Sequence, residues 1–186
     1  EGILTPLPGN EVEIPDDPPE DEKVEWESPV FENDSHGLKD DEGAKVDDAD
    51  KKIEEEKITE IWVEGHTSQE LPTQKWYDYN MRLGFNRAVV VANRLTSKNP
   101  NLIAHVTSYS WQYPKSQPAG SGANRRTDYW EFESKKSPKV LSQNPTISEK
   151  GIRATPHLEA TVTQSNQGKT VADGGTPNPA GNPPPG

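Results

Sequence analysis

Two stretches of the chain carry apolar residues at the spacing of an amphipathic helix. In residues 40–57, Val46, Ala49 and Ile53 recur three or four positions apart, which is the repeat of a helix that buries one face. In residues 80–97 the apolar stripe is longer and ends before an Asn-Pro pair, which disfavours further helix. The sequence therefore predicts one helix in each stretch. The stripe of the second helix consists of Gly84, Ala88, Val91, Ala92 and Leu95.

Four shorter stretches have the alternation or the apolar content of β-strands. They are residues 23–31, 59–64, 102–111 and 127–134. The first contains Pro29, which cannot donate to a ladder and therefore favours an edge position. The resulting order β-α-β-α-β-β predicts an α+β domain with a single sheet and both helices packed on one face.

The two ends of the chain differ from this central domain, residues 23–134. Residues 1–22 interleave prolines with acids and are predicted to be an acidic linker. Residues 135–186 are rich in Gly, Pro, Asn, Ser and Thr and have little to bury, so they are predicted to be a disordered tail. A weak alternation at 158–162 within this tail would form a strand only if a partner strand completed it.

Composition and charge narrow the class of protein. With 29% hydrophobic residues and 18 prolines among 186 residues, the chain is too polar to be packed throughout. The net charge is −11, and residues 1–57 hold 21 of the 31 acids but 6 of the 20 bases. An acidic chain without a basic stripe argues against nucleic acid and anionic lipid as partners. No apolar run approaches the ~20 residues of a transmembrane helix, and the absence of cysteine excludes a disulfide framework.

The reactive side chains do not form a recognisable catalytic or metal-binding pattern. Ser68 follows His66 by two positions, but such loop neighbours seldom reach triad geometry, and neither a G-x-S-x-G turn nor a matched acid is present. The four histidines lack the spacing of zinc ligands. Gly120 and Gly122 lack the strand–loop–helix frame of a phosphate-binding loop. We therefore expect a protein that is not an enzyme and has no metal or cofactor.

The arginines point instead to binding. Arg87 lies seven positions after Asn80 in the second predicted helix, so the two side chains share nearly one face. Arg125 and Arg126 open the last predicted strand. If the fold brings these guanidinium groups together, they suit a carboxylate, which accepts paired hydrogen bonds from arginine.

Three ordered motifs resemble those of the OmpA-like peptidoglycan-binding domain. They are GHTS at residues 65–68, NMRLGFNRA at 80–88 and NRR at 124–126, where the family has GHTD, NxxLSxxRA and NRR. The resemblance covers roughly residues 24–134. It implies a periplasmic domain of the bacterial cell envelope, associated with the outer membrane, that grips the diaminopimelate residue of the peptidoglycan stem peptide. The ligand-binding residues that it implies are Thr67, Ser68, Asn80, Leu83, Arg87 and Arg126, with Arg87 holding the ligand carboxylate.

The chain departs from the family pattern at two motif positions. Ser68 stands where the family has the aspartate that meets the ligand, and Gly84 replaces the serine of the second motif. Serine can accept a hydrogen bond but supplies no charge. Because a charged hydrogen bond contributes about 1.5–3 kcal/mol and a neutral one about 1 kcal/mol, we expect roughly tenfold weaker binding.

The missing carboxylate has one candidate replacement, Asp34. It lies in the loop before the first predicted helix, which in the resembling fold borders the same pocket. We predict that Asp34 meets the ligand's ammonium group. A competing interpretation is that Asp34 only begins a turn, because Asp-Ser-His-Gly is favourable turn chemistry.

A second function is compatible with the same residues. The segment between GHTS and Asn80 is longer than in the usual form and carries Trp76, Tyr77 and Tyr79. A degenerate domain with this aromatic loop as its surface would bind other envelope proteins rather than peptidoglycan. The parent system stays open among a porin, a lipoprotein, a flagellar stator and a secretion machine.

Overall fold

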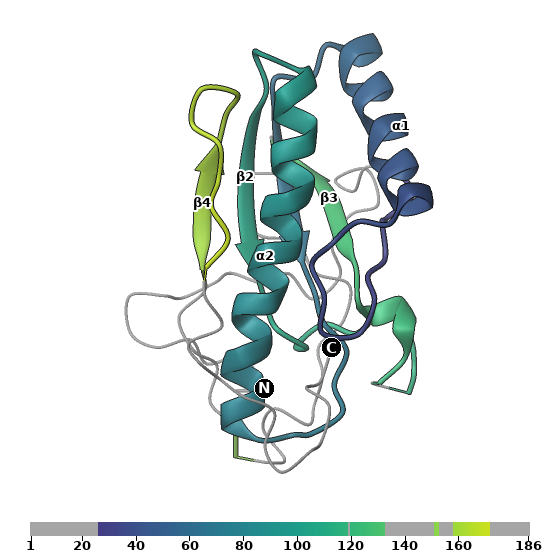
Figure 1. The fold of residues 1–186 in the computed structure, drawn as a ribbon, viewed down its shortest axis with the longest axis vertical. Coiled ribbons are helices and arrows are strands. Elements are labelled where there is room, and N and C mark those ends of the chain that lie inside the picture. The colour runs from purple at the N-terminus through teal and green to yellow at the C-terminus, as the bar shows by residue number, and fades with distance from the viewer. Residues whose placement is uncertain (1–25, 119, 133–150, 153–157, 172–186) are drawn as a thin grey trace.

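The computed structural model describes residues 26–118, 120–132, 151–152 and 158–171, and it confirms the α+β class. Within these residues the chain forms two helices and a mixed sheet of four strands (Figure 1). In chain order the elements are α1 (Asp40–Glu56), β1 (Glu60–Gly65), α2 (Gln74–Lys98), β2 (Ile103–Ser108), the 3-10 turn η2 (Gly122–Asn124), β3 (Thr127–Glu131) and β4 (Glu159–Val162).

The sheet has the strand order β3-β1-β2-β4. The two central strands β1 and β2 are parallel and are connected through α2, while β3 and β4 pair antiparallel to them on the outside. Alternate residues of the strands, such as Ile61 and Val63 of β1, join the apolar faces of α1 and α2 in one core. Both helices therefore cover the same face of the sheet (Figure 1), as the sequence predicts.

The first predicted strand, residues 23–31, is not a strand in the described part of the chain. It is reduced to an isolated bridge between Val30 and Arg126, and residues 23–25 lie outside the described residues. The amide of Phe31 donates to the Arg125 carbonyl at 2.8 Å, and the amide of Thr127 donates to the Pro29 carbonyl at 3.2 Å. Because proline has no amide hydrogen, a longer ladder would lack a bond at Pro29.

The prediction of a disordered tail over residues 135–186 is wrong for residues 158–171. Residues Glu159–Val162 form β4, which pairs with β2 in the register Ala104↔Val162 and Val106↔Ala160. Val162 is fully buried in the core. The partner strand on which the weak alternation depended is therefore the edge of β2. The predicted linker at residues 1–22 and most of the remaining tail lie outside the described residues.

Helix α2 begins six residues earlier than the pattern predicts. Trp76, Tyr77 and Tyr79 are helical and at most 6% exposed, so they do not form the exposed aromatic loop that the second function required. The hydroxyl of Thr73 caps the helix by accepting from the amide of Trp76 at 3.4 Å. Neither helix in the described part of the chain combines the length and apolar content needed to cross a bilayer.

The contact between α2 and the end of β1 depends on two glycines. A Cβ atom at Gly65 would lie 1.7 Å from the carbonyl oxygen of Gly84, and one at Gly84 would lie 2.5 Å from the Ser108 hydroxyl oxygen. That hydroxyl donates to the Met81 carbonyl of α2 at 2.7 Å. The absence of side chains at Gly65 and Gly84 thus allows the helix backbone to approach the strand end directly.

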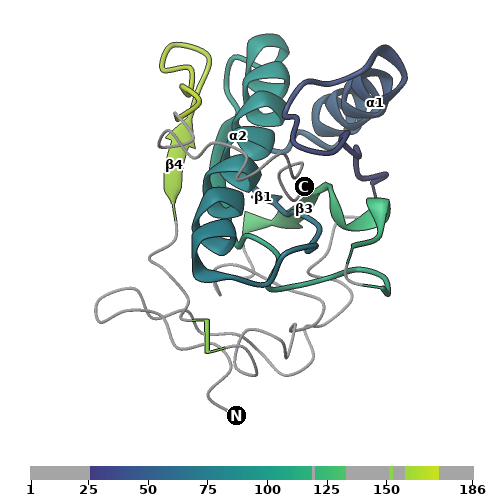
Figure 2. The same ribbon diagram turned by 60° about the horizontal axis from the view of Figure 1, so that its bottom comes forward.

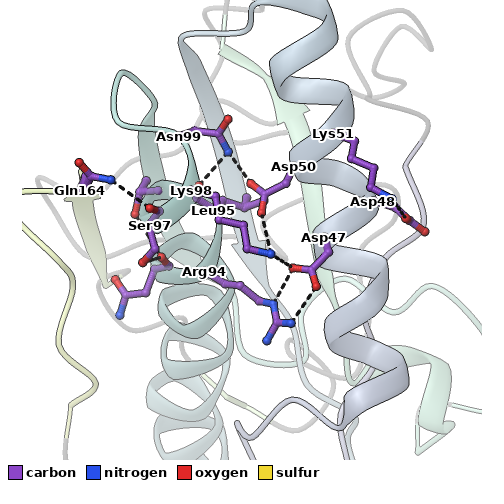
Figure 3. A network of polar contacts seen from close by, with 12 residues as sticks. Asp47, Asp48, Asp50, Lys51, Arg94, Leu95, Ser97, Lys98, Asn99 and Gln164 are labelled. Carbon is purple, nitrogen blue, oxygen red and sulfur yellow. Dashed lines mark hydrogen bonds and ion pairs between the residues drawn. The ribbon is translucent and has the colours of Figure 1, made fainter.

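The two helices are also joined by a polar network that lies between them (Figure 3). Asp47 of α1 accepts two hydrogen bonds at 2.9 Å from the guanidinium of Arg94, and its Oδ1 accepts a further bond from Lys98 at 2.7 Å. Asp50, one turn further along α1, accepts from the side chain of Asn99. These contacts hold the C-terminal end of α2 against α1.

Candidate functional site

The candidate site lies at the carboxyl end of β1, where three segments of the chain meet. They are the loop 31–36, the strand end 65–68 and the middle of α2. Figure 2 turns this end of the sheet forward. In a parallel pair such as β1 and β2, both carboxyl ends open on the same side of the sheet, which is where loop residues from different segments converge.

Arg87 connects the three segments. Its side chain is fully buried. Its Nε donates to the Ser35 carbonyl at 2.8 Å, its Nη2 to the Glu32 carbonyl at 3.0 Å and its Nη1 to the His66 carbonyl at 3.1 Å. The guanidinium carbon also lies 5.3 Å from the ring centre of Phe31, within the range of a cation–π contact.

The removal of an arginine that lies off the apolar stripe of a helix is generally expected to leave stability unchanged, but the complete burial of Arg87 argues against this here. The sequence predicts its face of α2 correctly, since it points away from the apolar stripe towards the end of β1. That face is covered by loop 31–36, where Arg87 donates to the part-buried carbonyls of Glu32 and Ser35. Arg87 thus supplies donors to backbone groups that lie outside a helix or strand.

The pKa of Arg87 is set by its burial and by a small group of neighbouring side chains. Burial lowers its pKa to about 9, and the nearby Arg125 acts in the same direction, whereas Asp34 and Tyr79 raise it. Arg87 is thus still cationic at neutral pH. The Tyr79 hydroxyl donates to the carboxylate of Asp34. A carboxylate, a phenol and a guanidinium from two distant segments therefore lie together.

Asp34 is exposed and has a φ of 54°, in the left-handed region. The amide of Ser35 donates to the Glu32 carbonyl at 3.3 Å across this turn. The turn interpretation of Asp34 is thus correct as far as the backbone is concerned. The contact with Tyr79 is additional to it, because a turn residue does not need a partner on a helix 45 positions away.

Thr67, Ser68, Asn80 and Leu83 are buried, each at most 6% exposed. The amide of Thr67 donates to the Ser110 carbonyl at 3.0 Å, and the side-chain amide of Asn80 donates to the Trp76 carbonyl at 2.8 Å. The Ser68 hydroxyl and the Asn80 side-chain oxygen have no hydrogen-bond partner among the described residues. These motif residues are therefore interior, whereas the exposed Asp34 lies in loop 31–36.

Arg126 belongs to a different group of buried charges. Its Nε donates to Asp128 at 2.9 Å and its Nη2 to the Tyr113 carbonyl at 3.2 Å. Asp128 pairs with Glu64 across β3 and β1, so both lie on the sheet face opposite to Val63 and the helices. The imidazole of His66 lies 3.4 Å from Glu64 and 3.7 Å from Asp128 on the same side. Arg125, rather than Arg126, is the neighbour of Arg87.

Three side chains of the site were not among the predicted ligand-binding residues. Tyr79 was assigned to a loop, Arg125 was counted among the arginines expected to converge but not among the ligand-binding residues, and His36 was considered only as a zinc ligand. Burial lowers the pKa of His36, the charge of Arg87 lowers it further, and Asp34 opposes both. His36 thus belongs to the same electrostatic group. For His36, the local signal in the sequence was its place at the end of a turn, shortly before the acidic first turn of α1.

No protein-family model and no curated protein sequence matches this chain. Solved structures do match. One is the OmpA-like domain of FopA1 from Francisella tularensis subsp. tularensis SCHU S4, with a TM-score of 0.51 and 17% identity over 55% of this chain and 68% of that one. Another is the peptidoglycan-associated lipoprotein from Burkholderia pseudomallei, with a TM-score of 0.42 and 22% identity over 55% of this chain and 87% of that one. The chain has the fold of an OmpA-like domain.

Proposed function

We propose that this domain binds peptidoglycan non-covalently through the diaminopimelate residue of the stem peptide, and so anchors a bacterial envelope protein to the cell wall. The domain is then a binding module in the periplasm and not an enzyme. The observation that carries the proposal is the grouping of Asp34, Tyr79 and Arg87 at the carboxyl end of β1. Diaminopimelate ends in an ammonium and a carboxylate group, which need an acceptor and a cation side by side.

The role of each residue follows from its place. Asp34 is exposed, is fixed by the Tyr79 hydroxyl and would accept from the ligand's ammonium group. Arg87 attracts the ligand's carboxylate and orders loop 31–36 from behind. Thr67, Ser68, Asn80 and Leu83 are buried and would shape the site from the interior, whereas Arg126 belongs to the separate group around Asp128.

Co-sedimentation with purified cell-wall sacculi tests the function. We expect the protein to pellet with sacculi and Asp34→Asn to weaken this binding about tenfold, because a charge-assisted bond becomes a neutral one. Asparagine tolerates the left-handed backbone at this position, so the turn is preserved. Asp48→Asn is the matched control, since Asp48 is equally exposed and lies on the outside of α1. Failure of the wild-type protein to pellet at high concentration would contradict peptidoglycan binding.

Ser68→Asp separates the relocated charge from a simple loss of charge. If Asp34 already meets the ammonium group, a second carboxylate brings no gain, because like charges at close range oppose each other's ionisation. If Asp34 is only a turn residue, Ser68→Asp strengthens binding about tenfold and Asp34→Asn has no effect. Because Ser68 is fully buried, circular dichroism must first establish that the variant folds.

The second candidate function is a protein–protein interaction module that has lost its ligand. One observation favours it: Arg87, the expected ligand-binding cation, already donates to three backbone carbonyls. The aromatic segment that this second function was expected to use as its binding surface is buried in α2. Absence of sacculus binding, together with capture of a defined envelope protein that Asp34→Asn does not disturb, would favour this function over the first.

A further inference from the structure

Residues 163–171 run back along α2 after β4 and are held by two asparagines of the helix. The Asn93 side chain accepts from the Gly168 amide and donates to the Gly168 carbonyl, both at 2.8 Å. The Asn86 side chain accepts from the Val171 amide at 2.7 Å and donates to the Val171 carbonyl at 2.9 Å. Each side-chain amide thus pairs with both polar backbone groups of one residue, as a neighbouring strand would.

The spacing of the two asparagines matches an extended chain. Seven residues of α-helix advance about 10.5 Å and return to nearly the same face. Three residues of extended chain, the separation of Gly168 and Val171, span about 10 Å. A segment in any other conformation would not present its amide and carbonyl groups to both asparagines. These contacts recognise backbone, so they set the conformation of the bound segment more strictly than its sequence.

Two apolar contacts add a limited sequence requirement. Val162 of β4 is fully buried. A Cβ atom at Gly168 would lie 2.9 Å from a methyl group of Val162 and 3.1 Å from one of Val89, so this position requires glycine. Lys169 and Thr170 are exposed. The fitting partner is therefore a segment with two extended arms joined by a turn, in which a valine of the first arm is followed six positions later by a glycine of the second.

The face of α2 that receives this segment differs from the face that packs in the core. Besides Val89 it presents Asn86 and Asn93, and near the helix end Thr96 and Ser97 bind Gln167 and Gln164. A face with mostly polar side chains remains compatible with water when the segment leaves. β4 pairs only with β2 in the sheet, so a single ladder holds it there.

We infer that the edge of β2 and the Asn86–Asn93 face of α2 form a receptor for a polypeptide segment with two extended arms joined by a turn, and that residues 158–171 of the same chain are its exchangeable occupant. A peptide with these residues should enter the receptor once the covalent connection is cut. In the intact chain the occupant has an effective concentration on the order of millimolar, which excludes an added peptide at micromolar concentration.

The test uses the full chain with a protease recognition site introduced between residues 133 and 150. After cleavage of the folded protein, a fluorescent peptide of residues 158–171 is added and its anisotropy measured. We expect uptake by the cut protein and not by the intact protein. Asn86→Ala and Asn93→Ala should each weaken uptake at least about tenfold, because each removes two hydrogen bonds. Asn101→Ala, on an exposed residue, is the matched control.

The peptide itself carries the sharper controls. N-methylation of Val171 should weaken binding because it removes the donor to Asn86, and Gly168→Val should abolish it. Thr170→Ala should leave binding unchanged. Equal binding of the N-methylated peptide would overturn the inference, as would a folded, cut protein that takes up no peptide.

Hydrogen exchange of the intact protein covers the case in which cleavage unfolds the domain. In the variant with both Asn86→Ala and Asn93→Ala, the amides of residues 159–171 should exchange faster, while those of β1 and α1 keep their protection. Loss of protection throughout the domain would show that residues 158–171 are an integral part of the core, and would overturn the inference.

Discussion

Asp50 carries a prediction about pH because its carboxylate is buried between α1 and α2. It is 6% exposed. One oxygen accepts from Asn99, but the other has no hydrogen-bond partner among the described residues and lies 3.9 Å from the Lys98 ammonium (Figure 3). Burial raises the pKa of Asp50 to about 6, although Lys98 and Asn99 lower it. The folded protein therefore binds this proton more tightly than the unfolded chain does.

The sign of the effect on stability follows from this raised pKa. In the unfolded chain Asp50 has its ordinary pKa of 3.8. The stability that its protonated form contributes is fully present below pH 3.8 and is lost as the pH rises through about 6. A difference of about two pKa units corresponds to roughly 3 kcal/mol at most. Asp50→Asn, which stays neutral, should therefore stabilise the protein at pH 7 by about 1–3 kcal/mol.

Urea denaturation followed by tryptophan fluorescence measures this difference. Wild type and Asp50→Asn should have nearly equal free energies of unfolding at pH 4 and diverge between pH 4 and 7. The comparison cancels the effect of other carboxylates, such as Asp47, whose pKa is lowered by Arg94 and Lys98. Asp48→Asn, on the exposed side of α1, should show no such divergence. A constant difference between wild type and Asp50→Asn over this pH range would refute the reasoning.

Three further predictions concern stability and are read by the same denaturation assay. Arg87→Met should cost about 2 kcal/mol or more, because the buried His66 carbonyl loses its donor at about 1–3 kcal/mol and the part-buried Ser35 and Glu32 carbonyls each lose a bond; Arg125→Ala, which removes one part-buried bond, should cost clearly less, and equal losses would contradict this account. Gly84→Ser should cost about 1–3 kcal/mol through its contact with the Ser108 hydroxyl, and adding Ser108→Gly should recover part of the loss; strict additivity of the two changes would argue against their contact. Gly65→Ala should be more damaging than Gly84→Ser, because its Cβ meets the backbone of α2 and not a movable side chain; a melting temperature close to that of wild type would contradict the close approach.

The elements that the sequence predicts well are those whose signal is local. The apolar stripe of α2 follows from helical periodicity alone, and Ala88, Val91, Ala92 and Leu95 are all fully buried. The start of α2 was missed because Pro72 and three aromatic residues resemble a loop. Thr73 was the available signal, since threonine is a preferred N-cap residue.

The elements that the sequence does not predict depend on partners elsewhere in the chain. β4 has four residues and exists because it completes the edge of β2, and a strand of this length has no stability of its own. The burial of Arg87 has the same kind of cause. The three carbonyls that surround it come from segments 21 to 55 positions away, and no local pattern shows that they converge.

At both positions where the chain departs from the family motifs, the polar group of the motif residue can come from another residue that lies nearby in the fold. At Gly84 the hydroxyl that the motif's serine would bring is supplied by Ser108, whose oxygen lies 2.5 Å from where a Cβ of residue 84 would be and bonds to the same helix. A hydroxyl group is thus present at nearly the same place in the fold, although Ser108 and not residue 84 carries it. The proposal for Ser68 and Asp34 has the same form, with a carboxylate carried by a neighbouring loop and oriented by Tyr79. The two cases differ in consequence, because the Gly84 exchange lies in the interior and affects packing. Asp34 is exposed, so under the proposed function its exchange would act on the ligand, and we expect sacculus binding rather than stability to respond to it.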